Sequence, residues 1–188
     1  MDDQVKNNIL RVLDKAILAI RNNDAKSLKD LSNETIHDAT VFQDEYSITI
    51  AVLFYALSKV YERDVHYGQF KGWKVFCNEC ALGFETAREK LENDDVEGFD
   101  FALKSYLESM RKLDKKLISY VQDVLHKARI TKASRLYEHG LSVGRTAELL
   151  GISRFELMDY IGKTYIADMK ENITIGVKDR LKFARGLF

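Results

Sequence analysis

The chain has 188 residues and no formal net charge, with 46% hydrophobic and 31% charged residues. This is the composition of an ordinary globular protein, and it excludes a disordered chain. The most apolar run, residues 48–57, is too short to cross a bilayer, which needs about 20 apolar residues. The opening MDDQVKNN lacks the basic and then apolar layout of a signal peptide, so we predict a cytoplasmic protein without a membrane partner.

The zero net charge conceals a difference between the two ends of the chain. Residues 1–126 hold 17 Lys and Arg against 22 Asp and Glu, a balance of −5. Residues 127–188 hold 12 against 7, a balance of +5. Because neutralisation of phosphate supplies most non-specific affinity for nucleic acid, the basic C-terminal third favours an acidic partner, either DNA or an acidic protein surface.

Glycine and proline divide the chain at a similar place. There is no proline, no glycine precedes position 68, and six of the ten glycines follow position 139. We therefore predict long helices in the first two-thirds and short helices with tight turns in the last third. Apolar periodicity predicts helices at about residues 5–20, 25–42, 45–63 and 73–91. The third of these is apolar nearly all round, which predicts that it is the central helix of a bundle.

A fifth and longest helix is predicted from a heptad spacing of large apolar residues. They recur at steps of three and four over three heptads: Leu103, Tyr106, Met110, Leu113, Leu117, Tyr120 and Val124. Such a stripe is the seam of a helical bundle or the interface of a homodimer. The sequence thus predicts an all-α fold, in which a four- or five-helix bundle at residues 1–127 leads into a C-terminal module.

The segment SVGRTAELLGISRFELMDYI, residues 142–161, has the pattern of a helix-turn-helix. Such a unit needs a small residue where its helices cross and a glycine in the turn that can take a positive φ. Ala147 and Gly151 fit these two positions. The inward faces of the two helices are supplied by Leu150, Ile152, Leu157 and Ile161. We predict that this unit occupies residues 128–164.

The start of each helix in this unit also carries a capping signal. Ser142 is a predicted N-cap of the first helix and Ser153 of the second. Ser153 and Glu156 match the capping box, in which each side chain hydrogen-bonds the backbone N–H of the other residue. The capping box accounts for Glu156, so we do not count it among the functional residues.

The outward residues of this unit predict two kinds of contact. Polar and basic side chains are suited to base edges or to phosphate, and the predicted DNA contacts are Arg145, Thr146, Ser153, Arg154 and Lys163. Phe155 and Met158 are apolar, and Asp159 would repel phosphate, so these positions favour a protein partner or a dimer contact. The unit is therefore predicted to bind a protein partner, DNA, or both.

Residues 133–163, ASRLYEHGLSVGRTAELLGISRFELMDYIGK, carry a more specific pattern. The stretch resembles a family of small prokaryotic helix-turn-helix proteins that are antitoxin-like and associated with PIN-domain ribonuclease toxins. The matching residues are Ala133, Leu136, Tyr137, Gly140, Leu141, Ser142, Gly144, Ala147, Glu148, Leu149, Leu150, Gly151, Ile152, Ser153 and Glu156. The resemblance covers about residues 130–164 and implies a non-catalytic regulator that binds a toxin and its own operator. The long N-terminal bundle departs from that family, whose members are short.

The last residues, 165–188, are predicted to form an amphipathic tail. Its apolar stripe consists of Val177, Leu181, Ala184 and Phe188, with basic residues beside it. Such a segment fits a groove of a partner protein. Because the resemblance implies a PIN-domain partner with a carboxylate-rich active site, the predicted partner contacts are Lys178, Arg180, Lys182 and Arg185. The alternative is a tail that folds back onto its own bundle.

Two groups of residues are candidate metal sites. Cys77 and Cys80 form a lone CxxC, which supplies two ligands where a structural zinc site has four. The alternative is a pair of buried, reduced cysteines in a helix. His37, Asp38 and Asp44 combine imidazole and carboxylate, which can bind a metal or transfer protons. Otherwise these residues are caps and turn formers.

Three classes of function are thus left open by the sequence. The favoured one is a non-enzymatic helix-turn-helix regulator that needs no cofactor. The second is a structural or adaptor protein whose helix-turn-helix packs on its own bundle. The third is a metal-dependent helical enzyme built on His37, Asp38 and Asp44, although the sequence has no phosphate loop, nucleophile elbow or metalloprotease motif.

Overall fold

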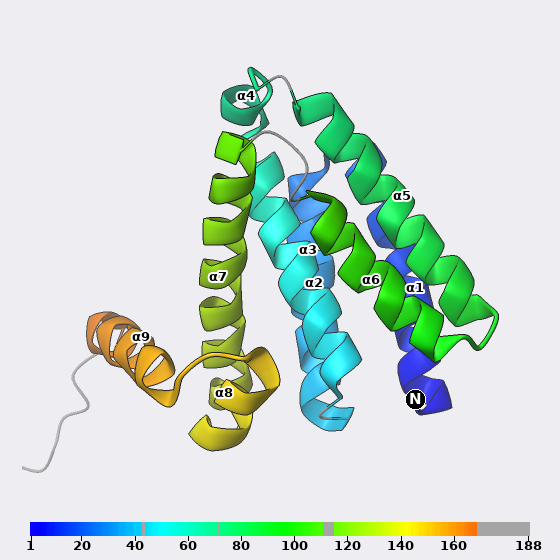
Figure 1. The fold of residues 1–188 in the computed structure, drawn as a ribbon. Coiled ribbons are helices and arrows are strands. Elements are labelled where there is room, and N and C mark those ends of the chain that lie inside the picture. The colour runs from blue at the N-terminus through cyan, green and yellow to red at the C-terminus, as the bar shows by residue number, and fades with distance from the viewer. Residues whose placement is uncertain (43, 71, 111–114, 169–188) are drawn as a thin grey trace, which may run out of the picture.

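The computed structural model describes residues 1–42, 44–70, 72–110 and 115–168, with the side chains of these residues except 106–110, 115–118 and 165–168. All regular structure in the described residues is α-helical, and this confirms the predicted all-α fold class. The helices are α1 (Asp3–Arg21), α2 (Ala25–Phe42), α3 (Glu45–Tyr61), α4 (Asp64–Tyr67), α5 (Trp73–Glu92), α6 (Val96–Met110), α7 (Lys115–Glu138), α8 (Val143–Leu150) and α9 (Arg154–Asp168). Their arrangement is shown in Figure 1.

The first hydrophobic core lies among α1, α2, α3, α5 and α6. It forms because each of these helices carries apolar residues at helical spacing, as in Val5, Ile9, Leu13 and Ala16 of α1, all of which are buried. We call this cluster the aromatic core, because its buried side chains include Phe54, Tyr61, Tyr67, Trp73, Phe76, Phe84 and Phe99. Ring contacts connect them, with the rings of Phe54 and Phe84 centred 5.5 Å apart.

The second hydrophobic core joins α2 and α3 to α7, α8 and α9. We call it the small-residue core, because five of its buried members are alanine. The buried members are Ile36, Ala39, Ile48, Ala51, Val52, Ala56, Ala128, Ala133, Leu136, Leu141, Leu150, Leu157 and Ile161. Alanine side chains allow helices to approach closely. The C-terminal helices are therefore packed directly on the bundle.

Helix α3 lies between the two cores, and its composition is the reason. It sends Ile50, Phe54 and Leu57 into the aromatic core, and Ile48, Val52 and Ala56 into the small-residue core. A helix can be buried on opposite sides only if it is apolar nearly all round. The prediction of a central helix between residues 45 and 63 is borne out by this burial, although α3 ends at Tyr61.

The predicted continuous fifth helix is wrong. The structure has two helices there, α6 ending at Met110 and α7 beginning at Lys115, and they pack on different neighbours. Leu103 is buried on α6 in the aromatic core, whereas Val124 on α7 contacts both cores. Tyr120, further along the predicted seam, is 42% exposed. Leu113, in the middle of the predicted seam, lies outside the described residues.

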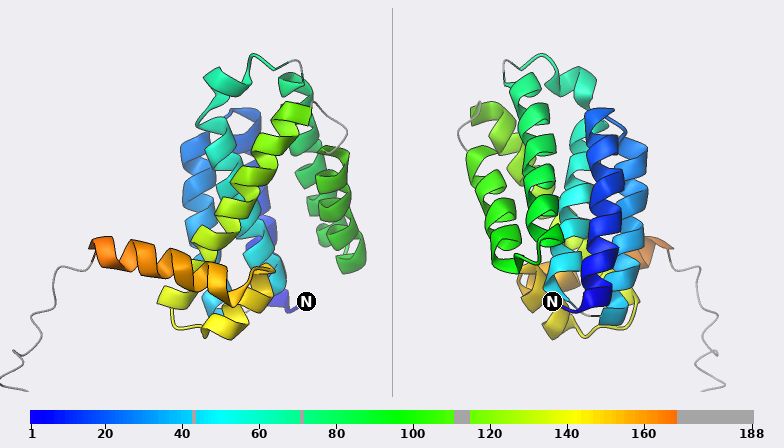
Figure 2. Two further views of the ribbon diagram at one scale, coloured as in Figure 1. Left: turned by 60° about the vertical axis from the view of Figure 1, so that its left-hand side comes forward. Right: turned by 90° about the vertical axis from the view of Figure 1, so that its right-hand side faces the viewer.

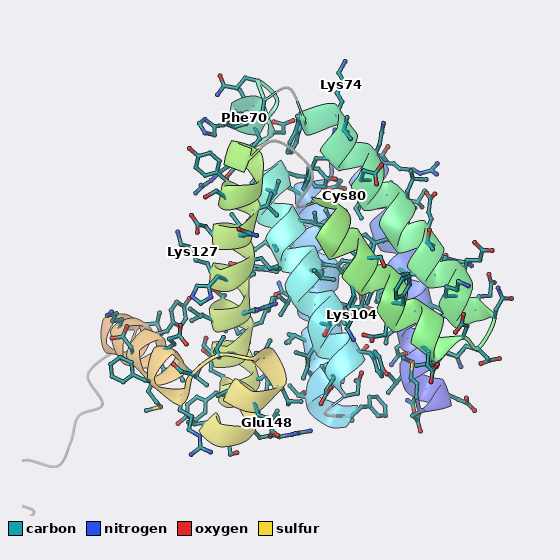
Figure 3. All side chains as sticks on the ribbon, in the orientation of Figure 1. Phe70, Lys74, Cys80, Lys104, Lys127 and Glu148 are labelled. Carbon is teal, nitrogen blue, oxygen red and sulfur yellow. The ribbon has the colours of Figure 1, made fainter. Side chains whose placement is uncertain are left out.

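The position between residues 127 and 128, predicted as a domain boundary, falls within α7. This helix runs from the end of the molecule that carries α4 to the end that carries α8 (Figure 1). Phe70 and Glu148, labelled in Figure 3, mark these two ends. Helix α7 is continuous across residues 127 and 128, and its Val124 contacts both cores. It therefore joins the bundle to the part of the chain that carries α8 and α9.

Candidate functional site

The α8–α9 unit begins with a capped helix and a glycine turn. Ser142 has an extended backbone, and its hydroxyl accepts a hydrogen bond from the Arg145 N–H at 3.2 Å. Helix α8 ends at Gly151, whose φ of 60° lies in the left-handed region that favours glycine. The Ile152 N–H donates to the Ala147 carbonyl and the Gly151 N–H to the Glu148 carbonyl, which is the Schellman pattern. The predicted cap and turn are confirmed.

The start of α9 is fixed by the predicted capping box. The Glu156 N–H donates to the Ser153 hydroxyl at 3.1 Å, and the Ser153 N–H donates to the Glu156 carboxylate at 2.8 Å. Hydrogen bonding of Ser153 to this carboxylate holds the pKa of Glu156 below its ordinary value. His126 on α7 lies 3.7 Å from the same carboxylate. Glu156 is thus occupied in positioning α9 against α7.

The inner faces of α8 and α9 are buried on the rest of the molecule. Leu157 and Ile161 of α9 and Leu150 of α8 belong to the small-residue core, and α8 contacts α3 and α7 while α9 contacts α7. Ala147 of α8 is also buried. The Arg154 end of α9 lies at the turn, and the helix then extends away from the bundle (Figure 2). The outer face of α9 is therefore held in a fixed direction and left open to solvent.

One predicted DNA contact is wrong. Thr146 is fully buried, because the face of α8 on which it lies is turned toward the rest of the molecule. Its hydroxyl has no hydrogen-bond partner among the described residues and cannot reach a phosphate. Thr146 was predicted to be exposed because it is adjacent to Arg145. The sequence alone does not show which face of α8 is buried.

The other predicted DNA contacts lie on the surface, but most already have a partner. Arg145 is paired with Glu148 at 3.1 Å and Lys163 with Asp159 at 2.6 Å. The Ser153 hydroxyl belongs to the capping box. Arg154 is exposed and has no carboxylate partner among the described residues. It is thus the cation of this group that is most available to an anion.

Arg154 lies against the first turn of α8. A Cβ atom added at Gly144 would sit 3.2 Å from Nη2 of Arg154, so the absence of a side chain at Gly144 permits this approach. The guanidinium forms one side of a polar groove, which is lined by Ser142, Gly144, Arg145, Ala147, Glu148, Ile152 and Arg154. Two guanidinium groups beside the N-terminus of a helix form a surface that suits an anion.

The two apolar residues predicted as partner contacts are exposed on α9. Phe155 is 81% exposed and Met158 is 48% exposed, and their spacing of three residues places them on one face of the helix. Gly162 follows four residues later, and a side chain there would meet nothing within 4 Å. Together Phe155, Met158 and Gly162 form what we call the α9 face. The predicted partner contacts Lys178, Arg180, Lys182 and Arg185 lie outside the described residues.

The residues considered as metal ligands do not come together. Asp44 is the N-cap of α3 and accepts from the Ser47 N–H at 2.7 Å, whereas Asp38 lies 3.8 Å from Arg11. The His37 ring packs against His139, with centroids 5.9 Å apart. In the described part of the chain, no three His, Cys, Asp or Glu side chains are grouped as a metal site requires.

Cys77 and Cys80 are reduced thiols on the side of α5 that faces Tyr61. Burial raises the pKa of Cys77 to about 11, so its thiol is protonated at neutral pH. Burial also raises the pKa of Tyr61, whose hydroxyl lies near both thiols. These cysteines behave as packing residues, which agrees with the alternative that the sequence offered for them.

Sequence reasoning missed a buried lysine. Lys132 on α7 is 1% exposed; its ammonium donates to the Asn33 side-chain oxygen at 2.9 Å and lies 4.7 Å from the centre of the Tyr55 ring. Burial lowers the pKa of Lys132 to about 8. The spacing of Lys132 in the sequence could have indicated its burial, since it lies midway between Ala128 and Leu136 on the buried stripe of α7.

Comparison with known proteins adds no relative to this picture. No family model, no curated protein and no solved structure matches the chain. Within the described residues, no helix combines the length and the apolar character needed to cross a bilayer.

Proposed function

We propose that this chain is a cytoplasmic, non-enzymatic regulator that binds a protein partner through the α9 face. The observation that carries the proposal is the 81% exposure of Phe155 on the first turn of a capped helix. A large aromatic side chain left in water is a common anchor of protein interfaces. Met158, one turn further, extends the same apolar surface.

The rigidity of α9 supports this proposal. Its first turn is held by the capping box, and its inner face is buried through Leu157 and Ile161. A helix that is already ordered loses little conformational entropy when a partner binds to it, and this raises its affinity. The exposed stripe at spacings of three and four residues is the pattern of a helix that enters a groove of its partner.

The chemistry of the partner comes from the resemblance of residues 130–164 to antitoxin-like helix-turn-helix proteins. It implies a PIN-domain ribonuclease as the partner. In that interpretation Phe155 and Met158 meet an apolar groove, while Lys178, Arg180, Lys182 and Arg185 meet its carboxylates. The basic balance of residues 127–188 supports an acidic partner surface.

The test is a titration of the full chain with a purified PIN-domain ribonuclease encoded beside its gene. We expect a stable complex by calorimetry. The double variant Phe155→Ser, Met158→Ser should weaken the complex by roughly 30-fold or more, because two interface anchors are removed. The matched control is Val65→Ser, which changes a 92% exposed apolar residue at the far end of the molecule. Unchanged affinity of the double variant would contradict the proposal.

DNA is the second candidate ligand, favoured by the position of Arg154 beside the polar groove at the start of α8. We expect binding to the DNA upstream of the gene to weaken steeply with salt. Arg154→Ala should reduce the preference for that sequence over unrelated DNA by about tenfold, which is the loss of one good base contact. Lys26→Ala, an exposed lysine on α2, is the control. Equal affinity for all sequences before substitution would exclude base readout.

A further inference from the structure

A groove of about 800 Å³ runs between α5 and α6, on the side of the molecule away from α9 (Figures 1 and 2). Its lining includes the small residues Gly83, Gly98 and Ala102. It also includes two large apolar side chains that are mostly in water, Leu82 at 55% and Phe101 at 71% exposure. An exposed apolar groove bordered by small residues is a surface on which a helix can pack closely.

The charges of this groove define what can occupy it. Glu79 on α5 and Glu97 on α6 line it, and neither has an ion-pair partner among the described residues. The third carboxylate of the lining, Asp95, is paired with Lys90 at 3.3 Å. The groove therefore carries two uncompensated negative charges beside its apolar surface. Its natural occupant is an amphipathic helix with basic residues along the apolar stripe.

The C-terminal segment of this chain, residues 174–188, matches that description in its sequence. Its apolar stripe runs from Val177 to Phe188, and it has four Lys and Arg against one Asp. On a helix the stripe would be roughly 16 Å long at about 1.5 Å per residue. The residues of α5 that line the groove run from Glu79 to Lys90, which is the same number of residues and the same length.

We propose that the α5–α6 groove binds the C-terminal segment of a second copy of this chain, so that two copies exchange their segments in a symmetric dimer. The same segment carries the proposed partner contacts Lys178, Arg180, Lys182 and Arg185, so the partner and the second copy compete for it. The segment of the same copy cannot reach this groove, because only a short linker joins it to the end of α9. Residues 169–173 span at most about 18 Å when extended. The bundle, including α3 and α7, lies between α9 and the groove, and each helix is about 10 Å across (Figure 1). Reciprocal exchange buries both segments and leaves no open end.

The experiment measures the mass of the full chain in solution by sedimentation over a range of concentrations. We expect a dimer. The double variant Glu79→Lys, Glu97→Lys should raise the dissociation constant of the dimer by about tenfold or more, because two attractive contacts become repulsive. Phe101→Ser should weaken the dimer in the same direction. Deletion of residues 174–188 should give a monomer.

Three controls separate this proposal from other causes. Glu89→Lys reverses an exposed charge on α5 outside the groove lining and should leave the mass unchanged. Phe155→Ser, Met158→Ser should also leave it unchanged, because the dimer does not use the α9 face. Charge reversal of the segment, with Lys178→Glu, Lys182→Glu and Arg185→Glu, should weaken the dimer alone and restore it when combined with Glu79→Lys, Glu97→Lys.

Two results would overturn the proposal. One is a wild-type chain that stays monomeric at all concentrations measured. The other is a dimer whose mass is the same with and without residues 174–188 or with Glu79→Lys, Glu97→Lys. Circular dichroism of each variant confirms that the helices are retained, since all of these substitutions are on the surface or in the C-terminal segment.

Discussion

The aromatic core and the small-residue core stabilise the molecule in different ways. The aromatic core buries whole rings, among them Phe54, Phe84 and Phe99, each 0% exposed. The small-residue core has no aromatic side chain among its buried members in the described residues, and it adjoins the buried ammonium of Lys132. Because free energy gained on burial follows the apolar area removed from water, the aromatic core contributes more per residue. The candidate site is therefore packed on the core that contributes less free energy of burial per residue.

The largest expected effect tests the aromatic core. Phe84→Ala should lower the free energy of unfolding by about 3–5 kcal/mol, since it removes a fully buried ring that packs on Phe54. Urea unfolding followed by circular dichroism measures this. Leu18→Ala, at a side chain of α1 that is 63% exposed, is the control and should change stability by no more than about 0.5 kcal/mol. Similar effects of the two substitutions would remove the basis of the comparison.

The next effect tests the burial of the Lys132 ammonium beside the small-residue core. The pKa of Lys132 is about 8 in the folded chain, against an ordinary value of 10.5. Between these two pH values the unfolded chain binds more protons, so the free energy of unfolding should rise with pH by about 3 kcal/mol and then level off. Lys132→Met should raise stability at pH 7 and remove this rise.

The measurement for Lys132 is the difference between wild type and Lys132→Met in urea unfolding at several pH values from 7 to 10.5. Taking the difference cancels the titration of other groups. Lys26→Met, at an exposed lysine on α2, is the control and should leave the pH profile in place. Parallel profiles for wild type and Lys132→Met would mean that burial does not lower the pKa of this lysine.

A smaller effect tests the turn of the α8–α9 unit. Gly151→Ala places a side chain at a φ of 60° and should lower the free energy of unfolding by about 1–2 kcal/mol. Gly162→Ala, in α9, should do the opposite and add about 0.5–1 kcal/mol, because a Cβ there meets nothing within 4 Å and alanine favours the helix. Thermal unfolding of both variants checks the pair, and two shifts of the same sign would contradict the assigned backbone conformation.

The smallest effect tests the cap of α9. Ser153→Ala removes the hydroxyl that accepts from the Glu156 N–H and should cost about 1 kcal/mol. Amide hydrogen exchange should show faster exchange in the first turn of α9 and unchanged exchange in α1. Ser119→Ala, at an exposed serine on α7, is the matched serine control. An unchanged first turn would mean that burial of Leu157 alone holds the start of α9 in place.

The sequence predicted local structure best where a single residue type determines the backbone. Ser142, Gly151 and Ser153 were assigned their roles correctly because caps and left-handed turns depend on chemistry within five residues. The heptad from Leu103 to Val124 was assigned to one helix, and the structure divides it between α6 and α7. Periodicity shows that a stripe is buried, but not against which neighbour. That choice depends on contacts between helices far apart in the chain.

By itself the sequence determined that the chain is helical, where α1, α2, α3 and α5 lie within two residues, and how the α8–α9 turn is capped. These features follow from backbone preferences and hydrogen bonds between neighbours. Only the tertiary structure decided that Thr146 and Lys132 are buried while Phe101 remains in water. The physical reason is that every helix has more than one face that can be buried. The packing of α8 on α3, and of α6 on α5, selects which faces are left for a partner.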